Sequence, residues 1–307
     1  MSAIPFVTLE SPRYGEAVQV SPLVRRVIAN NPSKYTYLGT GTYIVGHGDV
    51  AVIDPGPILD EHRDALALAL EGARVQAILV THCHSDHSPL AAWLRAETGA
   101  PTIAFGPHAA VEGDLEIDEA IEDGVTLEET TDTEFNPDVR VADGEVAVEG
   151  EGWTMRAVHT PGHTSNHMCY SLEQEHALFT GDHVMGWSTT VVSPPDGDMR
   201  AYIDSMRKVI ARDDASLWPT HGAPVTSPRP FLQAFLDHRL EREAQVLAAV
   251  RSGVSDVEAM VAGMYADVRT ELHKAAGRSV LSHLIKLVDD GLVSVEGKGK
   301  QSRYVPG

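Results

Sequence analysis

The sequence predicts an α+β protein: a layered core of packed sheets with flanking helices, followed by a small domain of helices and a hairpin. Short apolar runs alternate with turn signals through residues 1–230, and many strand-like runs follow one another without an intervening helix. The remaining segment, 231–307, reads as helices and then a hairpin. With 307 residues, 43% of them apolar, the chain can form one large domain and one small one.

Strands of the larger domain are predicted where short runs of apolar or β-branched residues lie between turn residues. Val75–Val80 is apolar almost throughout, which is typical of a strand buried on both faces. The predicted strands are Thr42–Val45, Val50–Ile53, Val75–Val80, Pro101–Phe105, Val139–Val141, Val146–Val148, Trp153–Val158, Met168–Leu172 and Ala177–Phe179.

Two helices are predicted between these strands. Leu59–Leu70 has the apolar spacing of an amphipathic helix. Ser88 and Pro89 suit the N-cap and the first position of a helix that runs to about Glu97. The acidic segment 112–138 contains no lysine or arginine, and we interpret it as a solvated excursion with short structured pieces.

The C-terminal segment has the element order of a winged-helix module. Pro228 and Pro230 mark its predicted boundary. The predicted helices and strands are, in order, Phe231–Val250, Val254–Met264, Glu271–Asp289, Leu292–Glu296 and Arg303–Val305.

Basic residues on the last helix and the hairpin could contact nucleic acid, but the segment is neutral overall. We therefore favour a dimerisation module, giving a homodimer, or a module that caps a substrate cleft of the larger domain. The basic residues are Lys274, Arg278, Lys286, Lys298, Lys300 and Arg303.

The net charge of −20 lies in residues 1–230, because 231–307 hold equal numbers of acidic and basic residues. Such a body repels polyanions, so we expect a small-molecule substrate and disfavour nucleic acid. No apolar run approaches the about 20 residues that span a bilayer, so no membrane partner is expected. The two cysteines and the absence of a signal-like start predict a reduced, cytoplasmic protein.

Four potential metal ligands lie within residues 82–87: His82, His84, Asp86 and His87. Imidazole nitrogen and carboxylate oxygen suit Zn²⁺, iron or Mn²⁺. The cluster begins where a buried strand ends and stops where a helix begins, so it should lie at one edge of a sheet. Cys83 alternates with two of these residues and should point away from a metal.

Three later turns carry the same residue types, and each follows a strand-like run. They are His159–Thr164, which contains His163; Thr180–His183, which contains Asp182; and Pro219–Gly222, which contains His221. All three can therefore lie at the same edge as residues 82–87.

These motifs, in this order, resemble the metallo-beta-lactamase superfamily over about residues 36–225. The resemblance implies a four-layer αβ/βα sandwich for residues 1–230. It also implies that His82, His84 and His163 hold one metal ion and that Asp86, His87 and His221 hold a second. Asp182 would bridge the two ions, and Asp54 would support the ligands.

The activity implied by this resemblance is that of a dinuclear hydrolase with two Zn²⁺ ions, iron or manganese being alternatives. A hydroxide bridging the metals would attack a small ester, thioester, lactone or amide. Asp86 is the candidate to take up the proton of the attacking water.

A closer resemblance is to the beta-lactamase-like protein 2 subfamily. It rests on Thr164–His167, Gly181–Thr190 and the C-terminal module. Gly41 departs from it, because the subfamily usually carries asparagine there. His167, His183, Trp187 and Ser188 flank the ligand turns and are candidates to support ligands or line the substrate cleft.

Three other functions remain open on the sequence. One is a single-strand-specific endoribonuclease, which the acidity disfavours. Another is a mononuclear iron dioxygenase of sulfur compounds, which shares these turns. The last is a winged-helix DNA-binding regulator with a vestigial hydrolase body, which the full set of ligand-type residues argues against.

Overall fold

The computed structural model describes residues 4–9, 11–108, 131–266, 273–297 and 302–307. Most of the predicted acidic excursion lies outside these ranges. So do the start of the helix predicted from Glu271 and the hairpin turn with Lys298 and Lys300.

The first sheet follows the chain in order. In the described residues its seven strands are arranged β1-β2-β3-β4-β5-β6-β7. Pairing is antiparallel from β1 to β4 and parallel from β4 to β7. The strands are β1 (Val18–Gln19), β2 (Val24–Ile28), β3 (Gly41–Val45), β4 (Asp49–Ile53), β5 (Arg74–Leu79), β6 (Thr102–Ala104) and β7 (Val139–Arg140).

The second sheet contains five strands within the described ranges, in the order β12-β11-β10-β9-β8. Its pairs are antiparallel except β11 with β12, which is parallel. The strands are β8 (Val146–Gly150), β9 (Trp153–His159), β10 (Met168–Leu172), β11 (Ala177–Gly181) and β12 (Ser216–Pro219).

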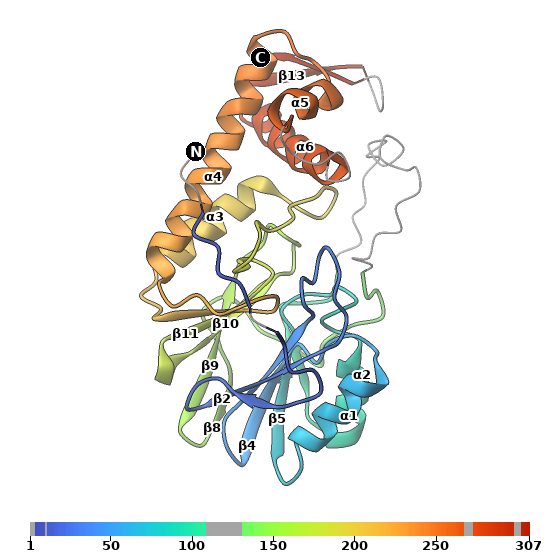
Figure 1. Cartoon of the computed structure of the whole chain (residues 1–307), viewed down its shortest axis with the longest axis vertical. Coiled ribbons are helices and arrows are strands. Elements are labelled where there is room, and N and C mark those ends of the chain that lie inside the picture. Colours follow the sequence, from blue (N-terminus) through green and yellow to red (C-terminus); the bar gives the residue numbers. More distant parts are fainter. Residues whose placement is uncertain (1–3, 10, 109–130, 267–272, 298–301) are drawn as a thin grey trace.

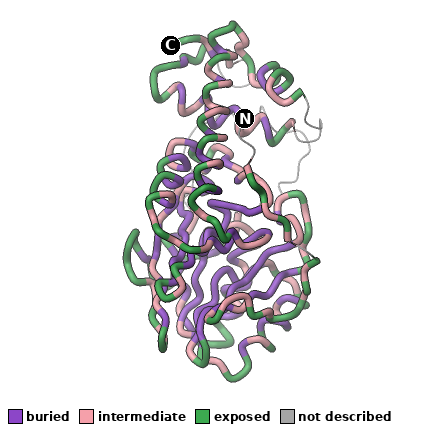
Figure 2. The backbone as a smooth tube through the Cα atoms, turned by 60° about the vertical axis from the view of Figure 1, so that its left-hand side comes forward, coloured by how far each residue is buried: buried purple, intermediate pink, exposed green. Residues whose placement is uncertain are grey.

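The two sheets and the helices that cover their outer faces form four layers. Their inner faces share one apolar core that includes Tyr43, Trp153 and Phe179. Helices α1 (Asp60–Ala69) and α2 (Leu90–Thr98) cover the outer face of the first sheet, as Figure 1 shows. Helices α3 (Met199–Ile210) and α4 (Pro228–Arg251) cover the second. Buried residues gather inside the larger part of the molecule (Figure 2), and the predicted α+β layered fold is confirmed.

Some local predictions were wrong. Ser88 does not cap α2: its hydroxyl donates to Asp132 Oδ2 at 2.7 Å, and the helix begins at Leu90. Helix α3 was not predicted, although Asp198 caps it by accepting from the amides of Arg200 and Ala201. Its buried residues recur at helical spacing: Met199, Tyr202, Ile203, Met206 and Val209.

The C-terminal module consists of α5 (Val257–Met264), α6 (His273–Asp289), β13 (Val293–Glu296) and β14 (Arg303–Pro306). Helix α4 runs into it: Phe231 and Phe235 pack on the sandwich, whereas Val246 and Val250 pack on α5 and α6. The module confirms the predicted winged-helix order. The domain boundary at residue 230 stays a prediction, because α4 contributes to both cores.

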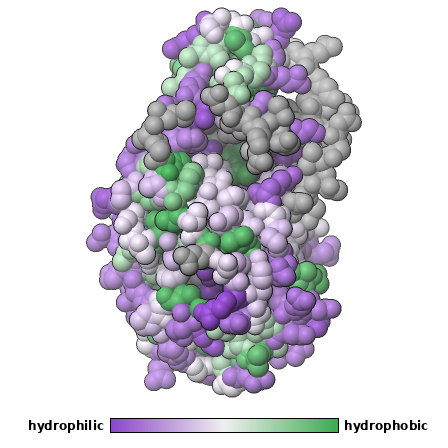
Figure 3. Space-filling view, in the orientation of Figure 1, coloured by the Kyte–Doolittle hydropathy of each residue, from purple (hydrophilic) through white to green (hydrophobic). Residues whose placement is uncertain are grey.

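The visible surface is mixed. On the face in Figure 3, hydrophilic side chains are widespread and hydrophobic ones form separate small groups. Among the described residues, no helix has both the length and the apolar character needed to cross a membrane.

Candidate metal centre

The loops that follow β5, β9, β11 and β12 bring seven residues together at one edge of the two sheets. The loop after β5 supplies His82, His84, Asp86 and His87, and the other three supply His163, Asp182 and His221. Gly181 permits the approach of the β11 loop, because it has φ +51° and a Cβ there would lie 2.7 Å from His167 Nε2.

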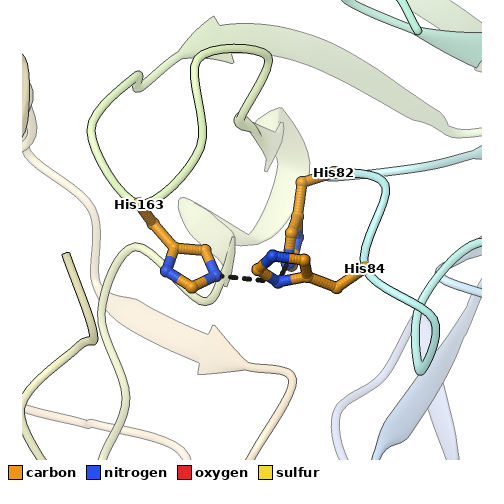
Figure 4. A group of neighbouring side chains, drawn as sticks. All are labelled: His82, His84 and His163. Atoms are coloured by element: carbon orange, nitrogen blue, oxygen red, sulfur yellow. Dashed lines mark hydrogen bonds between the residues drawn. The ribbon is translucent and has the colours of Figure 1, made fainter. Parts of the chain in front are cut away.

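One group consists of His82, His84 and His163. His84 Nδ1 lies 2.9 Å from His82 Nε2 and 3.1 Å from His163 Nε2. Figure 4 shows the three rings converging from two separate loops. Three buried or half-buried imidazole nitrogens at these distances could hold one metal ion.

A second group consists of Asp86, His87 and His221. Asp86 Oδ2 lies 3.4 Å from His87 Nε2 and 3.2 Å from His221 Nε2. Asp182 lies between the two groups: its Oδ1 is 3.4 Å from His221 Nε2, and its Oδ2 is 3.8 Å from His163 Nε2. Asp182 is therefore placed to contact an ion in either group.

Asp54 lies beneath the centre and accepts four hydrogen bonds. Its Oδ1 accepts from the Thr81 amide at 2.8 Å. Its Oδ2 accepts from Thr81 Oγ1 at 2.8 Å, His87 Nδ1 at 2.9 Å and Thr220 Oγ1 at 3.2 Å. The bond from Nδ1 directs His87 Nε2 toward the second group. Asp54 has φ 49°, a left-handed conformation that aspartate tolerates better than most residues.

Backbone carbonyls orient two other histidines. His163 Nδ1 donates to Val191 O at 2.6 Å, and His221 Nδ1 donates to Gly39 O at 3.3 Å. Because a carbonyl only accepts, both rings carry a proton on Nδ1, and Nε2 is the atom that faces the other ligand-type side chains. Thr40 Oγ1 also donates to Asp86 Oδ2 at 2.9 Å.

The two groups differ electrostatically. Burial lowers the pKa of His84 to about 3 and that of His82 well below its usual value, so both rings are neutral. Burial acts the same way on His87, but Asp86, Asp182 and Asp54 raise its pKa to about 9. Burial likewise opposes protonation of His221, but Asp182 and Asp86 raise its pKa well above 6.5. The second group thus has the negative field that attracts a cation.

The donor set fits a metal. His87 Nε2 and Asp182 Oδ1 are buried and lack a hydrogen-bond partner in the described part of the chain. Buried polar atoms without a partner are rare, and a metal ion would satisfy both. Nitrogen and carboxylate ligands in this ratio suit zinc, while iron and manganese accept the same types.

The predicted supporting residues occupy different surroundings. His167 accepts from the Asp182 amide through Nε2 at 3.2 Å, and its Nδ1 lies 2.9 Å from Thr160 Oγ1. His183 is fully buried, with its ring 5.0 Å from that of Tyr202. Thus His167 holds the backbone of a ligand turn, whereas His183 packs behind it.

Trp187 and Ser188 lie in the loop after β11. The Trp187 ring stacks on Tyr37 with centroids 4.8 Å apart, next to Gly222 and hence beside His221. Trp187 Nε1 lacks a hydrogen-bond partner among the described residues. Ser188 Oγ makes a long contact of 3.4 Å to Thr189 O.

Cys83 is buried away from both groups, and its sulfur accepts from Asn166 Nδ2 at 3.0 Å. The surroundings of Gly41 explain why a glycine fits at this position. Its amide donates to Thr220 O, and a Cβ there would lie 3.0 Å from that oxygen. A larger side chain at position 41 would therefore push against the loop of His221.

Sequence reasoning missed Thr40 and Thr81, which hold Asp86 and Asp54. Arg239 was not singled out either, although it is only 3% exposed. The signal for its burial was its spacing, because Phe235, Arg239 and Val246 follow one stripe of α4.

Comparisons with known proteins agree with this geometry. The metallo-beta-lactamase superfamily model matches residues 37–221, and the beta-lactamase associated winged helix domain model matches 257–301. Lactamase-like protein notP of Aspergillus sp. (strain MF297-2) is 30% identical over 315 residues, covering 95% of this chain and 89% of that protein. Atrochrysone carboxyl ACP thioesterase of Aspergillus chevalieri is 31% identical over 306 residues, covering 95% and 90%.

Solved structures give the same fold. A beta-lactamase domain protein from Burkholderia ambifaria has a TM-score of 0.78 at 22% identity, covering 96% of this chain and 95% of that one. A metallo-beta-lactamase family protein from Thermus thermophilus has a TM-score of 0.74 at 21% identity, covering 94% and 100%.

Proposed function

Because the chain belongs to the metallo-beta-lactamase superfamily, we propose that it is a metal-dependent hydrolase that cleaves thioesters with two zinc ions. One observation carries the proposal: Asp182 lies between two groups of ligand-type side chains at the same sheet edge. The thioester is chosen over other esters because a relative of matching length is named a thioesterase.

The ligands of this proposal follow the two groups. His82, His84 and His163 would hold one ion, and Asp86, His87 and His221 would hold the other, with Asp182 lying between the two groups. When bound, the metal ions would lower the pKa of a water molecule towards about 7 and polarise the thioester carbonyl.

The protein's own residues would orient the ligands and move one proton. Asp54, Val191 O and Gly39 O keep a proton on Nδ1 of His87, His163 and His221, so that each Nε2 stays free to bind. Asp86, held by Thr40, would take up the proton when the oxygen of water bonds to the carbonyl carbon. The C–S bond then breaks, and the leaving thiolate gains that proton to become a thiol.

Substrate would reach the centre beside Tyr37 and Trp187. This pair is half-buried and adjoins the His221 loop, so its rings could contact an acyl group. The net charge of −20 makes long RNA a poor substrate.

The test uses the full chain, its metal content and a matched panel of substrates. We expect about two zinc ions per chain and turnover of thioesters faster than of the corresponding oxygen esters. Asp182→Ala should lose turnover while remaining folded. A single iron ion with sulfur dioxygenase activity, cleavage of single-stranded RNA, or a fully active Asp182→Ala protein would contradict the proposal.

A further inference from the structure

Arg239 is a buried cation of helix α4. In the described part of the chain no carboxylate pairs with it; its guanidinium contacts a carbonyl oxygen and an aromatic ring. Its Nε is buried without a hydrogen-bond partner among those residues. Removing a charge from water is costly, so the contacts that Arg239 does make should matter to the fold or to the site.

These contacts fix the loop that follows Asp182. Arg239 Nη2 donates to Thr190 O, and its Cζ lies 5.2 Å from the centre of the Tyr202 ring. Tyr202 Oη donates to His183 O at 2.9 Å, and Thr190 Oγ1 donates to the same oxygen at 3.0 Å. The two ends of segment 183–190 are therefore tied to each other and to helices α3 and α4.

The residue after this segment orients a candidate ligand. Val191 O accepts the 2.6 Å hydrogen bond from His163 Nδ1. Val191 follows Thr190 directly in the chain, so a shift of the Thr190 carbonyl moves the acceptor of His163. The ring would then turn its Nε2 away from His84 and Asp182, which lie 3.1 Å and 3.8 Å from it.

Contacts with the C-terminal module fix the orientation of α4 about its own axis. Glu243, one turn beyond Arg239, accepts from Lys286 Nζ of α6 at 2.9 Å and lies 3.6 Å from His283 Nδ1. Helix α4 is thus fixed by the sandwich at one end and by α6 near Arg239. The guanidinium therefore contacts the loop from a helix that packs on the sandwich and pairs with α6.

We propose that Arg239 is a positioning residue that keeps His163 in its metal-binding orientation through Thr190 and Val191. The proposal rests on the two-metal function above. It makes the helix shared with the C-terminal module part of the support of the metal centre. Residues that orient metal ligands typically affect metal affinity by about 10- to 100-fold.

The test measures zinc binding to the full chain by competition with a chromophoric chelator. Arg239→Met removes the donor to Thr190 O but keeps a long side chain. Arg242→Met is the matched control, because Arg242 lies on the same helix but contacts the Tyr265 ring at 4.5 Å and Gln245. Circular dichroism and thermal melting check that each variant is folded.

We expect Arg239→Met to bind one ion with wild-type affinity and the other at least about 10-fold more weakly. Arg242→Met should bind both ions as the wild type does, even if its melting temperature falls as far as that of Arg239→Met. Wild-type affinities for both ions in folded Arg239→Met would overturn the proposal. If that variant does not fold, Arg239→Lys takes its place, because lysine keeps the charge but lacks the guanidinium fork. A selective loss of one ion in Arg239→Lys supports the proposal, and wild-type binding refutes it. A wild-type chain that binds no zinc would refute the two-metal function instead.

Discussion

Asp54→Asn should weaken one metal site by changing the tautomer of His87. The amide oxygen must replace Oδ1, because that position faces the Thr81 amide, which can only donate. The new Nδ2 then replaces Oδ2 and points at His87 Nδ1, which lies 2.9 Å from Oδ2. His87 must accept there, so its proton moves to Nε2, the atom that faces Asp86 and Asp182.

The loss of zinc affinity follows from the lost hydrogen bond between His87 Nδ1 and the Asp54 carboxylate. A hydrogen bond to a charged group contributes about 2 kcal/mol net, which corresponds to a roughly 30-fold loss of affinity for the ion held by Asp86, His87 and His221. The backbone should tolerate the change, because asparagine readily adopts the positive φ of Asp54, 49°. The fold is therefore kept, while His87 carries its proton on the wrong nitrogen for metal binding.

Zinc competition on the full chain measures this effect. Asp49→Asn is the control, because Asp49 begins the strand that ends just before Asp54 and pairs with Arg74 at the surface. It should leave both affinities unchanged. An Asp54→Asn protein that holds both ions as tightly as the wild type would refute this account of His87.

Three further predictions concern substrate, metal and acid. Trp187→Ala should raise KM for thioesters roughly fivefold with little change in kcat, because it removes one ring of the stacked pair beside His221; an unchanged KM would exclude Trp187 from the substrate cleft. Chelation should lower the melting temperature by about 4 °C relative to protein with zinc at about 100 times its Kd; no shift would show that the native state binds no metal. Burial lowers the pKa of His62 from 6.5 to about 4, so its neutral form stabilises the fold above pH 6.5 and that stability is lost as pH falls towards 4. Between pH 8 and pH 5 the wild type should therefore lose about 2 kcal/mol more unfolding free energy than His62→Gln in urea titrations, and equal losses would exclude His62.

Much of the sandwich was predictable because burial leaves a local pattern. β5 reads as an apolar run, and it lies in the interior of the first sheet. β2 was missed because Arg25 and Arg26 interrupt its apolar run. Arg26 is nevertheless buried, and its guanidinium donates to Gly222 O at 2.9 Å. That contact joins residues far apart in the chain, so no local pattern indicates it.

The residues of the candidate site also divide into those that a local pattern indicates and those that it does not. Its candidate ligands were predicted from turns that each follow a strand. The residues that hold them were not, because their contacts are set by tertiary structure. Thr40 contacts Asp86 across 46 residues, and Arg239 contacts Thr190 across 49. Both residue types are common on protein surfaces, so only packing distinguishes these two from their solvated counterparts.

Each candidate metal group takes side chains from both sheets, and this makes the centre depend on how the sheets pack. His82 and His84 follow β5 of the first sheet, whereas His163 follows β9 of the second.

Three hydrogen bonds hold the β12 loop against the first sheet. Tyr43 Oη donates to Pro219 O at 2.6 Å, the Gly41 amide to Thr220 O at 2.9 Å and Arg26 to Gly222 O at 2.9 Å. All three acceptors lie within two residues of His221. A substitution in the core between the sheets should therefore alter zinc affinity before it unfolds the protein, because the ligand distances are set by that interface.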